Sequence, residues 1–417
     1  MLGTRQKAFD WIVNQDPMQL TYDAPNLVQR FLLVLFYFQT TRHKPWRECN
    51  PTATGQESSS VTSNFCYEPD RFSGEITSTI WGERWLSASH ECQWAGVTCE
   101  TQLSTEKTVL RLGISWNGLN GHLPWEIAHL SQMTRLVLEH NALTGALPPS
   151  LFSNQAVPVL EMLGLSWNEF TGTIPLRWFD NLHGGTAKLS TIWISSNRLT
   201  GKIPSEMGLL PLKELRLGKT ALTGSLPMEI FQRASRVGIL DGIQPGEAVL
   251  GRALEIFDLS HTGISGTLPS EIGLANALKE LIVDDTNLNG KLPEELYGLG
   301  NLRALILNGC NLTGTISSSL GLLTDLYELH VADNDFHGTI PHEIEALTEL
   351  SQLLVNGNEF TGTVPVSICK DRFVAVEDVA MVVADCLPNE ETGAPTIECA
   401  ADCCTSCCDS TGVCLST

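Results

Sequence analysis

One motif of about two dozen residues recurs along most of this chain and constrains its fold more than any other feature. It reads L-x-x-L-x-L-x-x-N-x-L-x-G-x-I/L-P, and a clear copy runs from Leu163 to Pro175. One copy cannot bury its own leucines, so successive copies must stack into a solenoid. The ninth position sets the register of ten copies, in which it is occupied by Asn117, Asn141, Asn168, Asn197, Thr220, Thr262, Thr286, Cys310, Asn334 and Asn358.

The alternating leucines predict a short strand in every copy, with leucines pointing inward and their neighbours outward. We expect these strands to form one parallel sheet on the concave side of the solenoid. The ninth residue is buried where the chain leaves the strand, and an asparagine there can satisfy backbone groups with both its donors and its acceptor. Four consecutive copies, from Thr220 to Cys310, carry Thr or Cys instead. Each of these side chains can donate one hydrogen bond. We therefore expect the row of ninth-position hydrogen bonds, here called the ladder, to be weaker in these four copies but not interrupted.

The end of the motif, Gly-x-Ile/Leu-Pro, resembles the plant-specific subclass of leucine-rich repeats, found in receptor-kinase ectodomains and secreted hydrolase inhibitors. This resemblance implies an α/β solenoid, a right-handed superhelix with a concave parallel β-sheet, an α-helical N-terminal cap and a Cys-rich C-terminal cap. Residues 85–99 contain W…C-x-W-x-G-V-x-C and are similar to the N-terminal cap of that family, which implies a disulfide between Cys92 and Cys99. The long N-terminal region, its apolar helix and the Cys-rich tail are similar to membrane or secreted leucine-rich repeat proteins of diatoms and related algae.

Three regions follow from these patterns. Residues 1–108 form a helical N-terminal region and cap, residues 109–369 the ten repeats, and residues 370–417 a Cys-rich C-terminal cap and tail. Helices are predicted over residues 5–15 and 25–40; the second is apolar nearly all round, which indicates a capping helix, with a membrane-surface helix as the alternative. From Thr220 to Thr262 the step is 42 residues, and the excess at about residues 231–253 is either a binding loop or a tolerated excursion.

The thirteen cysteines lie mostly at the two ends of the repeat array. Their positions group Cys49 with Cys66, Cys92 with Cys99, and Cys369 with Cys386. Six more follow in the tail, where three disulfides are favoured over a zinc site. Cys310 occupies a ninth position and is predicted to be a buried free thiol. This usage suits an oxidising compartment, in which Asn311, the first residue of an Asn-Leu-Thr sequon, is a glycosylation candidate.

The ends of the chain bear on its location. Residues 1–7 have no apolar stretch that could act as a signal peptide, and no hydrophobic anchor closes the sequence. The apolar run at residues 31–38 is too short to span a bilayer, which needs about 20 residues. We expect an extracellular or cell-surface protein with a membrane tether in a missing upstream segment. A cytosolic protein with reduced thiols is the alternative.

The outward positions of the strands identify the candidate binding surface. Three tryptophans fall there within four repeats, and exposed aromatic surface marks partner sites. They predict an aromatic platform for a sugar ring or a peptide side chain; the alternative is that they shield the sheet. The later repeats display mainly acidic residues, typical of a solvated face, with a cationic ligand or Ca²⁺ as the alternative. The ligand-binding candidates are Arg111, Trp116, Arg135, His140, Trp167, Trp193, Arg216 and Lys219.

Composition and motifs narrow the function. The net charge of −21, from 26 basic and 47 acidic residues, argues against nucleic acid as a partner. The sequence carries no catalytic or nucleotide-binding signature, so we expect no enzyme activity, cofactor or metal. The prediction is an extracellular recognition module, the ectodomain of a cell-surface receptor or adhesion protein, that binds a protein, peptide or glycan. A secreted inhibitor of cell-wall hydrolases and a structural cell-wall protein are the alternatives, and the oligomeric state is open.

Overall fold

The structure is a computed structural model that describes residues 2–49, 65–69, 76–100, 107–151, 159–180, 188–232, 254–365, 368, 381–387, 397–399, 404–409 and 414–416. It contains two compact units. Unit 1 comprises residues 1–200 and 209–211, and unit 2 comprises residues 201–208 and 212–417. All but the first two residues of the insertion predicted at 231–253 lie outside the described residues, as does Cys369.

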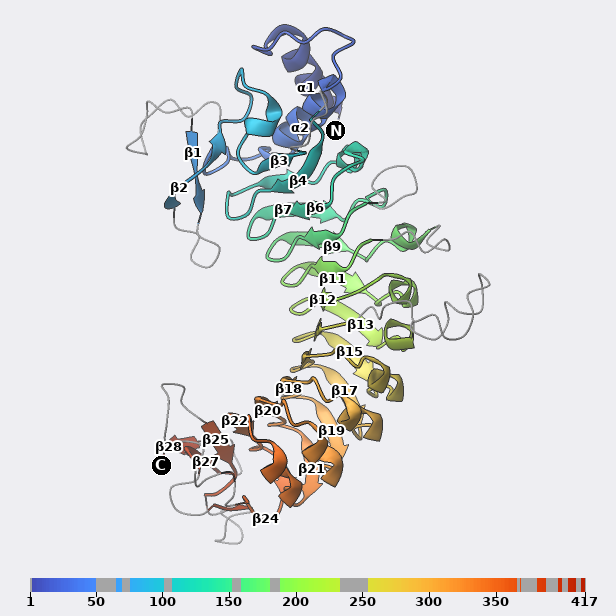
Figure 1. Ribbon diagram of the computed structural model, residues 1–417, viewed down its shortest axis with the longest axis vertical. Helices are drawn as coiled ribbons and strands as arrows, with labels where there is room; N and C mark the ends of the chain where they lie inside the picture. Colours follow the sequence, from blue (N-terminus) through green and yellow to red (C-terminus); the bar gives the residue numbers. More distant parts are fainter. Residues whose placement is uncertain are drawn as a thin grey trace. The chain divides into compact units, whose positions relative to one another are not determined.

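Each repeat contributes one short strand to a parallel sheet, as the alternating leucines predict (Figure 1). The inward residues Leu112, Leu136 and Leu163 are fully buried, whereas Arg111 and Arg135, which directly precede the first two, are exposed. In unit 1 these strands are β4(Val109–Gly113), β6(Arg135–Val137), β8(Met162–Gly164) and β10(Thr191–Trp193). In unit 2 they are β12(Glu214–Arg216), β14(Ile256–Asp258), β16(Glu280–Ile282), β18(Ala304–Ile306), β20(Glu328–His330) and β22(Gln352–Leu354).

The segment after the ninth position forms a second strand, which the motif did not lead us to expect. These strands also pair in parallel, from repeat to repeat, and the motif's glycine lies in the left-handed region, as at Gly172 with φ 79°. In unit 1 they are β5(Asn120–His122), β7(Ala142–Ala146) and β9(Glu169–Gly172), followed by β11(Arg198–Gly201), whose last residue belongs to unit 2. In unit 2 they are β13(Ala221–Ser225), β15(Gly263–Gly266), β17(Asn287–Gly290), β19(Asn311–Gly314), β21(Asp335–Gly338) and β23(Glu359–Phe360).

A short 3-10 helix follows the proline of most repeats and covers the side of the core away from the first sheet (Figure 1). Proline fixes the extended backbone before the helix, as at Pro269 with φ −73° and ψ 146°. These helices are η2(Trp125–His129), η3(Leu176–Phe179), η5(Ser205–Leu209), η6(Ser270–Leu274), η7(Glu294–Gly298), η8(Ser318–Leu322) and η9(His342–Ala346).

The ninth-position residues form the predicted ladder of side-chain hydrogen bonds. Asn168 donates from Nδ2 to the carbonyl oxygens of Leu138, at 2.9 Å, and Leu165, at 3.1 Å, while its Oδ1 accepts from the backbone N–H of Leu143. Thr262 donates one bond, to the Leu259 carbonyl oxygen at 2.8 Å. The Thr and Cys copies therefore keep a single donor each, and the strands on either side remain in register.

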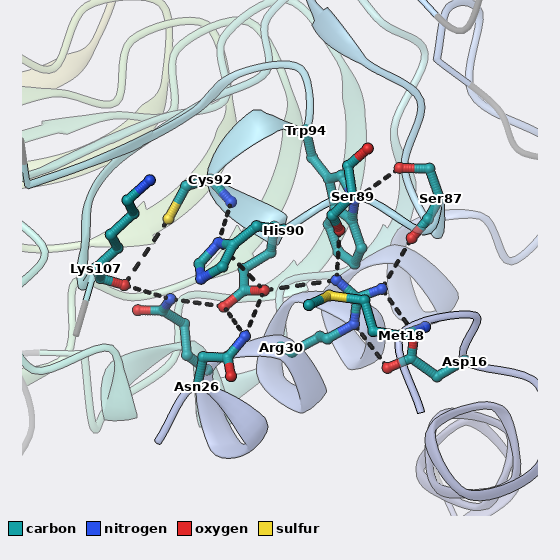
Figure 2. A network of polar contacts seen from close by, with 12 residues as sticks. Asp16, Met18, Asn26, Arg30, Ser87, Ser89, His90, Cys92, Trp94 and Lys107 are labelled. Atoms are coloured by element: carbon teal, nitrogen blue, oxygen red, sulfur yellow. Dashed lines mark hydrogen bonds and ion pairs between the residues drawn. The ribbon is translucent and has the colours of Figure 1, made fainter. Parts of the chain in front are cut away.

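Two α-helices precede the repeats in unit 1, α1(Leu2–Asn14) and α2(Leu27–Thr40). A buried ionic network anchors α2 to the cap (Figure 2). The Arg30 guanidinium is fully buried, donates two 2.7 Å hydrogen bonds to the Asp16 carboxylate and lies 3.5 Å from Glu91. The central apolar residues of α2 are buried too, which supports a capping role. Among the described residues, no helix is long and apolar enough to cross a membrane.

The cap itself contains a hairpin and an antiparallel edge strand. The hairpin strands β1(Phe65–Pro69) and β2(Ile76–Glu83) precede η1(Glu91–Gln93) and β3(Val97–Cys99), which pairs antiparallel with β4. Buried Trp46, Trp85 and Trp94 form the aromatic centre of this region. Disulfides join Cys49 to Cys66 and Cys92 to Cys99, the two pairings expected at this end.

The C-terminal cap corrects one predicted disulfide. Cys386 pairs with Cys407, so the predicted bond between Cys369 and Cys386 is wrong. The reason is that β25(Met381–Ala384) adds a parallel strand beyond β22, and β27(Ser406–Cys408) pairs with it, which brings Ala384 opposite Cys407. Further disulfides join Cys399 to Cys404 and Cys408 to Cys414. The remaining short strands are β24(Gly362–Thr363), β26(Ile397–Glu398) and β28(Cys414–Ser416).

The end of the repeat ladder in unit 2 is closed by a carboxylate. Asp385 accepts from the backbone N–H groups of Gly357, at 3.0 Å, and Asn358, at 3.3 Å. The Asp385 carboxylate thus accepts hydrogen bonds from N–H groups that would otherwise pair with a further copy of the motif. Burial raises the pKa of Asp385, and the two N–H donors oppose that shift.

Candidate functional site

Six of the eight predicted ligand-binding residues lie in unit 1. Arg111 and Arg135 are opposite one another on β4 and β6, and Trp193 ends β10. Trp116, His140 and Trp167 each precede a ninth-position asparagine. These three residues share a left-handed backbone, with φ of 58°, 54° and 57°. Non-glycine residues rarely adopt this conformation, and its repetition points three consecutive side chains in the same direction.

The three side chains form a continuous stack. The rings of Trp116 and His140 are nearly parallel, with centroids 3.8 Å apart, and those of His140 and Trp167 follow at 5.3 Å. His140 thereby covers one face of each indole. Trp167 at the end of the stack is 51% exposed. Burial lowers the pKa of His140, which favours the neutral imidazole between the two indoles.

A hollow of about 500 Å³ opens beside this stack. Its lining includes Arg111, Arg135, Trp116, His140, Trp193 and Trp81. The structure therefore brings five of the predicted residues together around one space, while Trp167 lies beyond its lining. Arg111 and Arg135 contribute to the lining from strands of the first sheet, and Trp116 and His140 contribute to it from the stack.

Trp81 was missed by the sequence reasoning. It belongs to β2, outside the repeats, so the repeat numbering gave it no outward position. Gly96 explains its approach: a Cβ there would collide with the Gly113 carbonyl oxygen and lie 3.0 Å from the Trp81 ring. The Trp-x-Gly of the cap signature, Trp94-Ala95-Gly96, was the one signal in the sequence for such a close contact.

The two arginines outnumber the carboxylate of Glu139, which also lines the hollow, and give this space a local positive charge in a strongly acidic chain. Their Cα atoms are register partners on adjacent strands, so both guanidiniums rise from the same part of the sheet. Among the described residues, neither forms an ion pair with a carboxylate. Both side chains are exposed. Like charges in this arrangement repel one another, and an anionic group between them would relieve that repulsion.

The other two candidates, Arg216 and Lys219, belong to unit 2. Arg216 lies 3.8 Å from the Glu280 carboxylate, so its charge is partly compensated there. Lys219 has the same left-handed backbone as the stacked residues, with φ 54°. The structure does not join these two residues to the hollow of unit 1.

The remaining predicted residues are ordinary parts of unit 2. Asn311 begins β19 and is exposed, so its side chain is accessible for glycosylation. Cys310 is a buried free thiol, as predicted, and contacts Thr286 Oγ1 at 3.2 Å. Burial raises the pKa of this thiol.

The chain has the features of a repeat-protein solenoid. Its strands stack in parallel, its ninth-position side chains form a row of hydrogen bonds, and its ends are capped. The Leucine Rich Repeat family profile matches residues 188–210, 253–274 and 301–323. These matches and the receptor relatives below show that the chain contains leucine-rich repeats similar to those of plant-type leucine-rich repeat proteins.

Several known proteins resemble this chain over part of their length. Receptor-like protein 3 of Arabidopsis thaliana is 29% identical over 193 residues, covering 43% of this chain and 25% of the relative. The ectodomain of the Arabidopsis receptor kinase HAESA, solved with the peptide hormone IDA and the co-receptor SERK1, is 25% identical with a TM-score of 0.55. That match covers 72% of this chain and 46% of the solved HAESA chain. This chain thus spans less than half of either relative.

A second solved ectodomain is similar. The Arabidopsis thaliana receptor kinase GASSHO1/SCHENGEN3, in complex with CASPARIAN STRIP INTEGRITY FACTOR 2, is 28% identical with a TM-score of 0.50. The match covers 62% of this chain and 31% of that one. The relatives therefore include both receptor-like proteins and receptor kinase ectodomains.

Proposed function

We propose that this chain is the non-catalytic ligand-binding module of an extracellular receptor-like protein, and that a peptide ligand binds in the hollow of unit 1. The observation that carries the proposal is that the neighbouring residues Arg111 and Arg135 line the same hollow as Trp81, Trp116 and Trp193. Guanidiniums bind carboxylates through charge-assisted hydrogen bonds, and aromatic rings bury apolar side chains. The ligand is accordingly an acidic peptide with apolar side chains.

The comparisons support a peptide over a glycan. HAESA was solved with a peptide hormone, and the curated relatives include receptor-like proteins. Disulfides at both ends of the repeats agree with an oxidising, extracellular location. A tether to the membrane would then lie outside this chain.

The stack of Trp116, His140 and Trp167 changes how the aromatic surface would act. Since His140 covers a face of each indole, a ligand meets mainly ring edges along the stack. Trp193 lines the hollow, whereas Trp167 does not. Of the three tryptophans predicted as one platform, Trp116 and Trp193 would therefore contact a ligand in the hollow, and Trp167 would not.

A peptide array tests this proposal. The full chain is probed with acidic peptides and with their amidated, uncharged counterparts. We expect acidic peptides to bind, and Arg111→Gln with Arg135→Gln to weaken binding at least tenfold, since each hydrogen bond between charged groups contributes about 1.5–3 kcal/mol. Arg198→Gln is the matched control, because Arg198 is exposed, pairs with Glu169 and does not line the hollow.

Two further variants separate the hollow from the stack. Trp193→Ala should weaken the same peptides, while Trp167→Ala should leave binding in the hollow unchanged. Equal binding of acidic and uncharged peptides, or wild-type affinity in the double arginine variant, would overturn the proposal.

A further inference from the structure

A second cluster of chemically reactive side chains lies in unit 2, in the repeats that display mostly acidic residues. His261 follows β14, and Asp284 and Asp285 follow β16 in the next repeat. One donor atom from each of the three side chains lies within 4.8 Å of the others. These groups line no part of the hollow in unit 1.

The geometry of the cluster centres on the imidazole of His261. Its Nδ1 lies 2.8 Å from Asp285 Oδ2, and its Nε2 lies 3.8 Å from Asp284 Oδ2. The backbone N–H of His261 also donates to the Asp284 carbonyl oxygen at 2.8 Å. Both repeats are thus locked together at the point where the three side chains meet.

The backbone holds two of these side chains in the same orientation. His261 and Asp285 occupy equivalent positions in successive repeats, with φ of 51° and 52°. The next equivalent position is Gly309, where a Cβ would collide with Asp285 Oδ1. The absence of a side chain at Gly309 gives the Asp285 carboxylate room to lie along the column, with its other oxygen toward His261.

Charge within the cluster is poorly balanced. Two neighbouring carboxylates face one imidazole, and Asp258 lies close enough to repel Asp284. The side chain of Asp284 is 20% exposed, against 54% for Asp285. A bound cation would offset the repulsion between these carboxylates.

We propose that His261, Asp284 and Asp285 bind a divalent transition-metal ion of the Zn²⁺ type. One imidazole nitrogen and two carboxylate oxygens are ligands that Zn²⁺ accepts, and a three-residue site leaves a fourth position for water or a ligand group. Ca²⁺ fits less well because it takes 6–8 oxygen ligands. The site is independent of the hollow, so it can be present whether or not a peptide binds there.

The test is a calorimetric titration of the oxidised, chelator-treated full chain with Zn²⁺. We expect one ion per chain, with at least tenfold weaker binding in each of the variants His261→Gln, Asp284→Asn and Asp285→Asn. An equal concentration of Ca²⁺ should not displace Zn²⁺. Far-ultraviolet circular dichroism checks that each variant retains the fold.

His342→Gln is the matched control. His342 lies 3.3 Å from Glu343 and is 80% exposed, so it is a histidine beside a single carboxylate. It should leave Zn²⁺ binding unchanged. The proposal would be overturned by the absence of stoichiometric binding, by unchanged affinity in His261→Gln, or by an equal loss in the control.

Discussion

The guanidinium carbon of Arg30 lies 4.7 Å from the ring centroid of Trp94, so a helix that precedes the cap places its cation on an indole of the cap. The same guanidinium donates to the backbone carbonyl oxygens of Ser87, at 2.8 Å, and Ser89, at 2.9 Å (Figure 2). One buried side chain thereby joins α2, the loop containing Asp16 and the cap.

Replacing Arg30 should strongly destabilise unit 1. Arg30→Met would leave the buried carboxylates of Asp16 and Glu91 without their cation, and loss of one partner of a buried pair costs about 3–5 kcal/mol. The measurement is urea unfolding followed by tryptophan fluorescence. Arg198→Met, which removes an exposed pair with Glu169, should cost less than about 1 kcal/mol. Equal losses in the two variants would contradict a structural role for the buried network.

Removing a ninth-position asparagine should destabilise the protein more than removing a ninth-position threonine hydroxyl. Asn168→Ala removes donors to Leu138 and Leu165 and the acceptor for Leu143, and should cost about 2–4 kcal/mol. Thr262→Val removes a single donor and should cost about 1 kcal/mol. Chemical denaturation of both variants measures the difference. If Thr262→Val were as costly as Asn168→Ala, the ladder in unit 2 would be no weaker than in unit 1.

Stability should fall as the solution is acidified below pH 6.5, in part because of His330. Burial lowers the pKa of His330 below its ordinary 6.5, against opposing effects of Glu328, Gln352 and Asp284. The unfolded chain therefore takes up a proton at a higher pH than the folded chain. The stabilising contribution is complete above pH 6.5 and is lost as the pH falls through the folded-state pKa. Urea midpoints across this window should decline less steeply for His330→Asn than for the wild type, and an identical slope would contradict the assignment.

Asn311 should carry a single glycan when the chain is produced in a secretory host. Its side chain is exposed at the start of β19, and Thr313 completes the sequon. Intact-mass spectrometry before and after glycosidase treatment measures the modification. Asn311→Gln and Thr313→Ala should both abolish it, whereas Asn289→Gln, at an exposed asparagine without a sequon, should not. A glycan that survives Asn311→Gln would contradict the prediction.

Periodicity explains which parts of this molecule could be predicted. A fixed repeat assigns each outward residue to a strand and a neighbour, so Arg111 opposite Arg135 followed from numbering. The second sheet did not follow, because its residues pair only when the glycine turns of adjacent repeats coincide in space. Cys386 was assigned to the wrong partner since the pairing of β25 with β27 is tertiary and leaves no period in the sequence.

The binding site was predictable to a similar extent. Repeat numbering identified the residues on the strands but gave no account of how their rings would lie. The sequence suggested that the rings of Trp116 and Trp167 are exposed on their faces. Because Trp116, His140 and Trp167 share a left-handed backbone, their rings instead stack on one another. Trp81 escaped because it comes from a hairpin with no counterpart in the repeats.

The antiparallel strands at the two ends of the repeats bear on the self-association of such a chain. A parallel strand edge would offer its unpaired N–H and C=O groups to another copy of the same motif, and growth could then continue from molecule to molecule. In unit 1, β3 runs against β4, and in unit 2, β28 runs against β27. Each reversed strand is only three residues long. At both ends, another copy of the repeat therefore meets a short reversed strand instead of a parallel strand that it could extend.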